Sequence, residues 1–91
     1  MIGNDELLIK VKNGLGITGD FQDNTLQIYI DEVKDFMHGA GVSDAIINSN
    51  RSIGVITRGV SDLWDYGSGS TGLSPYFKER VVQLRAGEKD V

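Results

Sequence analysis

The chain has 91 residues, 40% of them hydrophobic and 24% charged, with a formal net charge of −4 and no cysteine. This length suits one small domain spanning residues 1–91, and the missing cysteines exclude disulfides and thiolate chemistry. The acidic balance disfavours a protein that holds nucleic acid by neutralising many phosphates, because such a protein needs a basic face.

The first predicted helix covers residues 4–16. Asn4 is a candidate N-cap, and the acidic residues after it lie where the helix dipole favours negative charge. The apolar residues recur with helical spacing and should face the core, while the glycines near the end should stop the helix. These apolar positions are Leu7, Leu8, Val11 and Leu15.

The second predicted helix runs from Asn24 to His38 and has the clearest periodicity. Asp23 or Asn24 can cap its start, and Gly39 with Gly41 closes its end. The residues that recur at three- and four-residue steps should be buried; they are Leu26, Tyr29, Ile30, Val33, Phe36 and Met37. Charged residues occupy the other side, among them Asp31, Glu32 and Asp35.

Two further helices are predicted before a glycine-rich stretch. A short one covers residues 43–50 with Ser43 as its cap, and a longer one covers residues 51–66. Gly54 and Gly59 weaken the longer helix by about 1 kcal/mol each relative to alanine, unless a neighbouring helix approaches closely there. The β-branched residues of IGVIT leave a strand as the alternative for this segment.

The stretch YGSGSTGLSPYF, residues 66–77, matches two phosphate-binding patterns as text. Gly67, Gly69 and Gly72 fit the dinucleotide fingerprint, and the same segment resembles a P-loop with Leu73 in place of lysine. The first pattern needs a preceding strand in a parallel sheet, and the second needs the lysine charge, so both fail. The segment is either ordinary slack between helices or a mobile loop that orders against a partner.

The last predicted helix covers residues 74–85. Ser74 at the cap and Pro75 at the first helical position are a clear start signal. Its core residues should be Phe77, Val81 and Leu84, and residues 86–91 should form a frayed tail. The chain is therefore predicted to be an all-α bundle of about four helices, with a flexible glycine and serine loop before the last one.

Candidate catalytic or metal chemistry is sparse. Asp31, Asp35 and His38 could share one helix face, but three ligands on an exposed helix make a weak metal site, and a solvated acidic face is the favoured alternative. One histidine, no cysteine and no visible nucleophile–base pair give little support to catalysis. We therefore expect that the protein is not an enzyme and that it binds no cofactor and no metal.

The chain also lacks membrane and export signals. No apolar run approaches the roughly 18 residues of a membrane span, and the start MIGNDELLIKV lacks the layout of a signal peptide. We therefore expect no membrane partner, and a protein that stays in the compartment where it is made.

The order of these features resembles the small α-helical head–tail connector proteins of tailed bacteriophages, also called head-completion or adaptor proteins. Three stretches carry the resemblance, namely ELLIKVKNGLGITGDFQDNTLQIYIDEVKDFMHGAGV, ITRGVSDLWDYGSG and LSPYFKERVVQLR. The first stretch matches the family's short helix, D-x-x-D turn and long helix. The second resembles a later helix that ends in an aromatic residue, and the third resembles a closing helix that begins at proline. In one departure, Asp65 and Tyr66 stand where many relatives carry basic residues.

The resemblance implies a structural, non-enzymatic subunit of the virion. Copies of such proteins, typically twelve or thirteen, form a homo-oligomeric ring beneath the portal protein of a filled capsid, after assembly in the host cytoplasm. The ring extends the DNA channel without binding the DNA specifically, and it offers a docking surface for a head-closure or tail protein. An acidic channel lining would repel the duplex and let it slide.

Two groups of residues are candidates for these contacts. The glycine loop and the closing helix are expected to form the interface, with a solvated helix face as the alternative for the basic residues. The interface candidates are Tyr66, Gly67, Gly69, Gly72, Tyr76, Lys78, Arg80 and Arg85. The acids expected to face the channel are Asp31, Glu32 and Asp35.

A helix-turn-helix DNA-binding domain is the second hypothesis. Its size and helix count agree with this chain, and SDAIINSNRSIGVITRGV can be fitted to it. The charge disagrees, because a recognition helix is expected to bring several Lys or Arg to the DNA backbone. A nucleotide-binding enzyme that uses the glycine stretch is the third hypothesis.

Overall fold

The computed structural model describes residues 3–66 and 72–89. Its elements are α1 (Asn4–Leu15), α2 (Asp23–Gly39), α3 (Asp44–Ile47), the 3₁₀ turn η1 (Asn50–Ser52), α4 (Ile53–Tyr66) and α5 (Pro75–Lys89). No strand occurs among the described residues, so the predicted all-α fold is confirmed, and the alternative strand at IGVIT is wrong.

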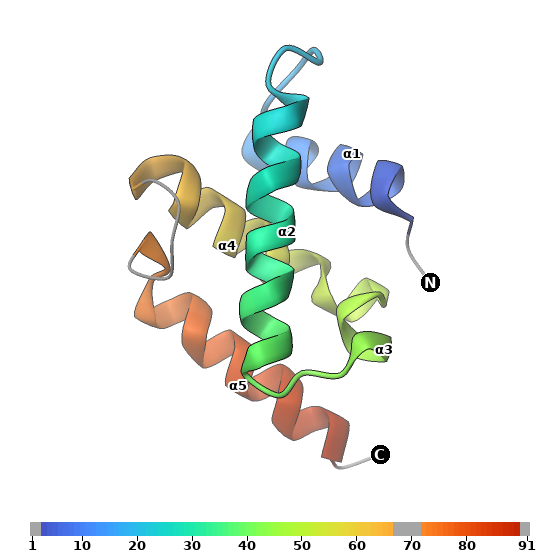
Figure 1. Ribbon diagram of the computed structural model, residues 1–91, viewed down its shortest axis with the longest axis vertical. Coiled ribbons are helices and arrows are strands. Elements are labelled where there is room, and N and C mark those ends of the chain that lie inside the picture. The colour runs from blue at the N-terminus through green and yellow to red at the C-terminus, as the bar shows by residue number, and fades with distance from the viewer. Residues whose placement is uncertain (1–2, 67–71, 90–91) are drawn as a thin grey trace.

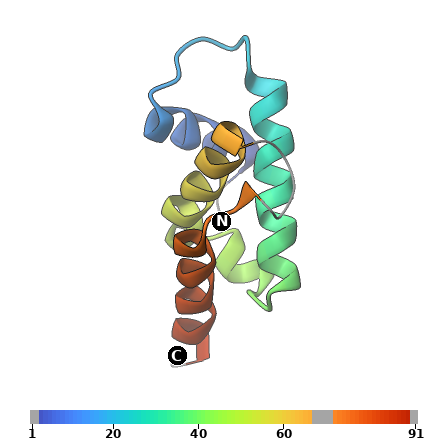
Figure 2. The same ribbon diagram turned by 90° about the vertical axis from the view of Figure 1, so that its left-hand side faces the viewer.

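The helices form two layers. α2 makes up the front layer of Figure 1, and Figure 2, turned by 90°, shows α1, α4 and α5 together on the other side of the molecule. α4 crosses behind α2 and packs against α1, α2 and α5. Because there are only two layers, the molecule is flat, with extents of 40 × 28 × 18 Å.

The core lies between the two layers, and α4 is at its centre. The helical stripes predicted from the sequence supply most of it, because α1, α2 and α5 each turn apolar residues toward α4. Its buried members are Leu7, Val11, Leu26, Ile30, Val33, Met37, Val42, Ile47, Val55, Ile56, Val60, Leu63, Leu73, Phe77, Val81 and Leu84. Half-buried side chains close its edge, including Trp64, which meets the ring of Tyr29 edge to face with 6.3 Å between centroids.

Gly59 marks the point where three helices come closest. A Cβ atom at this position would lie 2.7 Å from the ring of Phe77 on α5 and 2.9 Å from a methyl group of Val33 on α2. The close helix approach that the sequence analysis named as the exception therefore occurs at Gly59, and it explains why a glycine lies inside this helix. At Gly54 no neighbouring atom lies within 4 Å of such a Cβ, so packing does not require that glycine.

The helix starts agree with the sequence at two places and differ at two others. The Ser43 hydroxyl accepts the Ile46 N–H at 3.3 Å, and the Ser74 hydroxyl accepts the Phe77 N–H at 3.1 Å, as predicted. The predicted caps of the first two helices are wrong. Gly3 and Gln22 hold these positions without a side-chain hydrogen bond.

Asp23 has a different role from the predicted cap. Its carboxylate lies 2.7 Å from the ammonium group of Lys12, so this ion pair joins the start of α2 to the end of α1. At the other end of the chain, α5 continues to Lys89 beyond the predicted end at Arg85. Fraying of residues 86–91 in solution stays a prediction.

Candidate interaction surface

A buried carboxylate joins α4 to the start of α5. Asp62 is only 4% exposed, and its Oδ2 atom accepts both the backbone N–H of Ser74 at 3.0 Å and the Ser74 hydroxyl at 2.7 Å. The other oxygen, Oδ1, lies 3.3 Å from Nε of Arg58. Because Ser74 also caps α5, this network fixes the beginning of α5 against α4.

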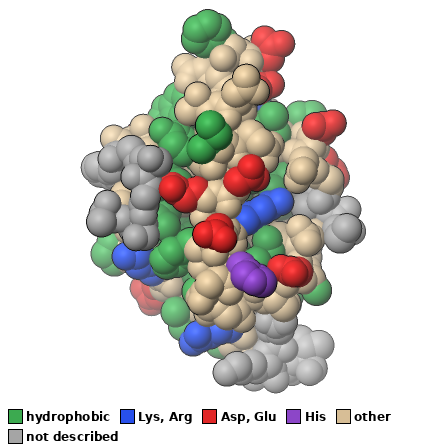
Figure 3. All heavy atoms as spheres, viewed as in Figure 1, with side chains coloured by type: hydrophobic (Ala, Val, Ile, Leu, Met, Phe, Trp, Pro, Cys, Tyr) green, Lys and Arg blue, Asp and Glu red, His purple; other side chains and the backbone are tan. Residues whose placement is uncertain are grey.

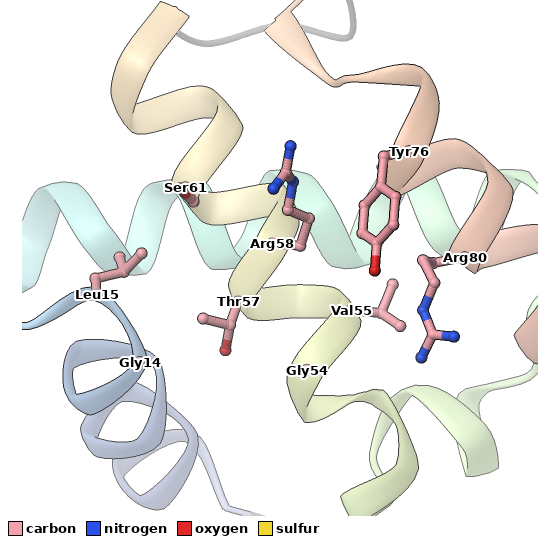
Figure 4. Close-up of a pocket in the computed structure, with 9 residues that line it drawn as sticks. All are labelled: Gly14, Leu15, Gly54, Val55, Thr57, Arg58, Ser61, Tyr76 and Arg80. Atoms are coloured by element: carbon pink, nitrogen blue, oxygen red, sulfur yellow. The ribbon is translucent and has the colours of Figure 1, made fainter.

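A groove of about 430 Å³ runs between α1, α4 and α5 (Figure 4). Its floor is made by small and aliphatic side chains of α4, with Leu15 of α1 on one side and Tyr76 of α5 on the other. The guanidinium carbon of Arg58 stands 5.0 Å from the centre of the Tyr76 ring, a cation–π contact. Figure 4 also shows α2 passing behind α4, so the groove opens away from α2.

A second hollow, of about 310 Å³, shares Arg80 with this groove. It is lined by Arg51, Arg80, Gln83 and Leu84. The Arg80 guanidinium donates to the neutral side chain of Gln83 at 2.9 Å. None of the described residues that line either hollow is acidic. We call the two hollows together the arginine groove.

The outward side of α2 carries the opposite charge. Figure 3 shows acidic side chains gathered over this helix, with a basic side chain and the histidine beside them. Asp31 and Asp35 are exposed and Glu32 is half-buried, and Ile28, 63% exposed, lies on the same side one helical turn earlier. We call these four residues the acidic face.

The three residues that were considered as metal ligands do not converge. Asp31 accepts a hydrogen bond from Gln27 at 2.9 Å, while Nδ1 of His38 lies 3.3 Å from Asp44. Among residues 3–66 and 72–89, no group of three or more His, Asp or Glu side chains has the geometry to hold a metal ion.

The structure brings only part of the predicted interface together. Tyr76, 57% exposed, and Arg80 both line the arginine groove, and Gly72 lies half-buried just before α5. Tyr66 is the last residue of α4, and Gly67 and Gly69 lie outside the described residues. A shared contact role for this set stays a prediction.

The two remaining basic candidates lie apart from the groove. Lys78 is exposed on α5 and lines neither hollow. Arg85 donates to the backbone carbonyl of Ala40 at 3.1 Å, and its side chain lies against Gly41. Arg85 therefore already serves to hold α5 to the end of α2.

Sequence reasoning missed several exposed apolar residues, of which Phe21 and Ile28 are the most exposed. Phe21, in the turn before α2, is 95% exposed, and Ile28 interrupts the charged side of α2. A phenylalanine within a polar turn and an isoleucine off the core stripe were the available signals. Neither residue joins the core.

Two hypotheses lose their structural basis. The dinucleotide fingerprint must follow a strand of a parallel sheet. Here the glycine stretch follows α4, and the described residues contain no strand. The helix that would act as a recognition helix is α4, which lies at the centre of the core and packs against three other helices. Such a helix cannot insert into a DNA groove without disrupting the fold.

Comparison with known proteins gives one match. The family described as phage gp6-like head-tail connector protein has a model that matches residues 5–85. No curated protein and no solved structure matches the chain significantly. Separately, no helix within the described part of the chain is long and apolar enough to cross a membrane.

Proposed function

The chain belongs to the phage gp6-like head-tail connector family, and from this premise we propose that it forms a ring beneath the portal vertex of a phage capsid. The family match carries the proposal, because it extends from the first turn of α1 into α5 and so includes every helix of the fold. The family supports a structural role in the virion, and we infer no catalytic role.

In the proposed role, copies of the chain assemble in the host cytoplasm, in a ring of twelve or thirteen. The ring binds the portal protein on one side and a head-closure or tail protein on the other, and DNA passes through it without sequence-specific contacts.

Electron microscopy tests this proposal directly. The purified chain would be imaged alone and after mixing with the portal protein of the same phage. Rings, or an added layer of density on the portal, are the expected result. If neither appears at any protein concentration, the connector proposal is wrong.

A gel-shift assay with duplex DNA at low salt provides the control for the helix-turn-helix hypothesis. The free chain should not shift the duplex, because its net charge is −4 and its central helix packs against three other helices. A tight, salt-sensitive shift by the monomer would instead favour a DNA-binding protein.

A further inference from the structure

We propose that neighbouring copies of the chain contact each other through their two broad faces, with the acidic face of one copy packed into the arginine groove of the next. This inference rests on the proposed ring. It names the surfaces that would build the ring, and it takes a second copy of the chain as the partner.

The two surfaces lie on opposite sides of the molecule. Figure 1 looks down the shortest axis onto α2, and Figure 2 shows that α1, α4 and α5 make up the other layer. The groove between these three helices faces away from α2 (Figure 4). A contact between opposite faces is heterologous, and repeating it produces a ring when the rotation closes.

The charges of the two surfaces are complementary. The acidic face presents Asp31, Glu32 and Asp35. The arginine groove presents Arg80 beside a neutral glutamine, and none of its described lining residues is acidic. Arginine suits this role because its planar guanidinium binds a carboxylate through two parallel hydrogen bonds. Like charges would oppose a contact between two acidic faces or between two grooves, which favours the head-to-tail arrangement.

Each surface also has an exposed apolar residue among its charges. Ile28 is 63% exposed on the acidic face, and Tyr76 is 57% exposed at the edge of the groove. Protein interfaces usually combine such apolar side chains with polar groups around them. The broad faces measure 40 × 28 Å, which is large enough for the roughly 800 Å² per partner that a stable contact needs.

This contact changes the role expected for the acids. Asp31, Glu32 and Asp35 would lie between subunits, and a side chain buried there does not line the DNA channel. Arg80 and Tyr76 keep the interface role predicted from the sequence, now with a specific partner surface.

Chemical cross-linking tests the contact, because the natural chain has no cysteine and gives no background. The double variant Ile28→Cys/Ser61→Cys places one thiol on the acidic face and one in the groove. Since these positions lie on opposite faces of one chain, a bismaleimide linker between them joins two chains. We expect a ladder of dimers, trimers and larger species, whereas each single variant stops at the dimer.

The matched control is Ile28→Cys/Lys78→Cys, whose second thiol is on α5 but outside the groove. It should give no ladder beyond the dimer. An equally strong ladder from the control, or no ladder from the Ile28→Cys/Ser61→Cys variant, overturns the assigned contact.

Charge reversal gives a second test. Asp31→Lys/Asp35→Lys and Arg51→Glu/Arg80→Glu should each weaken self-association at least tenfold in sedimentation velocity. An equimolar mixture should recover it, because the reversed acidic face of one variant then matches the reversed groove of the other. A mixture that associates no better than its components contradicts the inference.

The outcomes separate this inference from the proposed function. If the natural chain forms rings on the portal but the cysteine pair gives no ladder, the connector role stands and the contact is wrong. If neither rings nor a ladder form, both proposals are wrong.

Discussion

Oδ2 of Asp62 accepts two hydrogen bonds from Ser74, one from its backbone N–H at 3.0 Å and one from its hydroxyl at 2.7 Å. The two residues are twelve positions apart, on either side of the glycine-rich stretch. The pair therefore fixes where α5 starts, whatever the length of chain between them. It also orients Arg58, which pairs with the same carboxylate and stacks on Tyr76 in the groove.

Removing this carboxylate should destabilise the fold. We expect Asp62→Ala to lower the free energy of unfolding by about 2–3 kcal/mol, because it leaves two Ser74 donors without their buried acceptor. Urea denaturation followed by circular dichroism measures the change. The control Asp65→Ala removes an exposed carboxylate of the same helix and should stay within about 0.5 kcal/mol. Equal effects from both substitutions would refute the anchoring role.

The two glycines of α4 should respond in opposite directions to alanine. Gly59→Ala is expected to cost about 1–3 kcal/mol of stability, since its Cβ would overlap Phe77 and Val33. Gly54→Ala should stabilise by about 0.5–1 kcal/mol, because alanine favours the helix and no atom lies near the new methyl group. Thermal melts of both variants check this, and stabilisation by Gly59→Ala would show that the helices are further apart than described.

Two phenylalanines allow a similar comparison. Phe77 is fully buried, so Phe77→Ala should cost about 3–5 kcal/mol, a large share of the stability of a domain this small. Phe21 is 95% exposed, and Phe21→Ala should change stability by less than about 0.5 kcal/mol. Denaturant titration of the monomeric chain gives both values. A large loss from Phe21→Ala would mean that this side chain packs within the monomer.

Self-association should depend on salt. If the acidic face meets the arginine groove, raising sodium chloride from about 0.05 M to about 0.5 M should weaken the contact, because added ions screen charges that remain near solvent. Sedimentation velocity at a fixed protein concentration measures the effect. Association that strengthens with salt would point to a mainly apolar contact and count against the charge pairing.

The helices, most of their core positions and two of their caps could be predicted from the sequence alone. These features depend on residues three or four positions apart, as in the apolar stripe of α2 or the Ser74–Pro75 start of α5, so they can be read locally. The family resemblance was also visible at this level, because it follows the order and lengths of the helices.

The contacts between groups on different helices depend on the tertiary structure. The residues around Asp62 in the sequence do not indicate that it accepts hydrogen bonds from Ser74. Those around Asp23 do not indicate that it pairs with Lys12 and does not cap α2. The spacing of the charged residues of α2 predicted its acidic side. The groove on the opposite side of the molecule exists only because α1, α4 and α5 pack side by side. Periodicity fixes the direction of a side chain around its own helix axis, whereas the neighbour it reaches depends on how separate helices pack together.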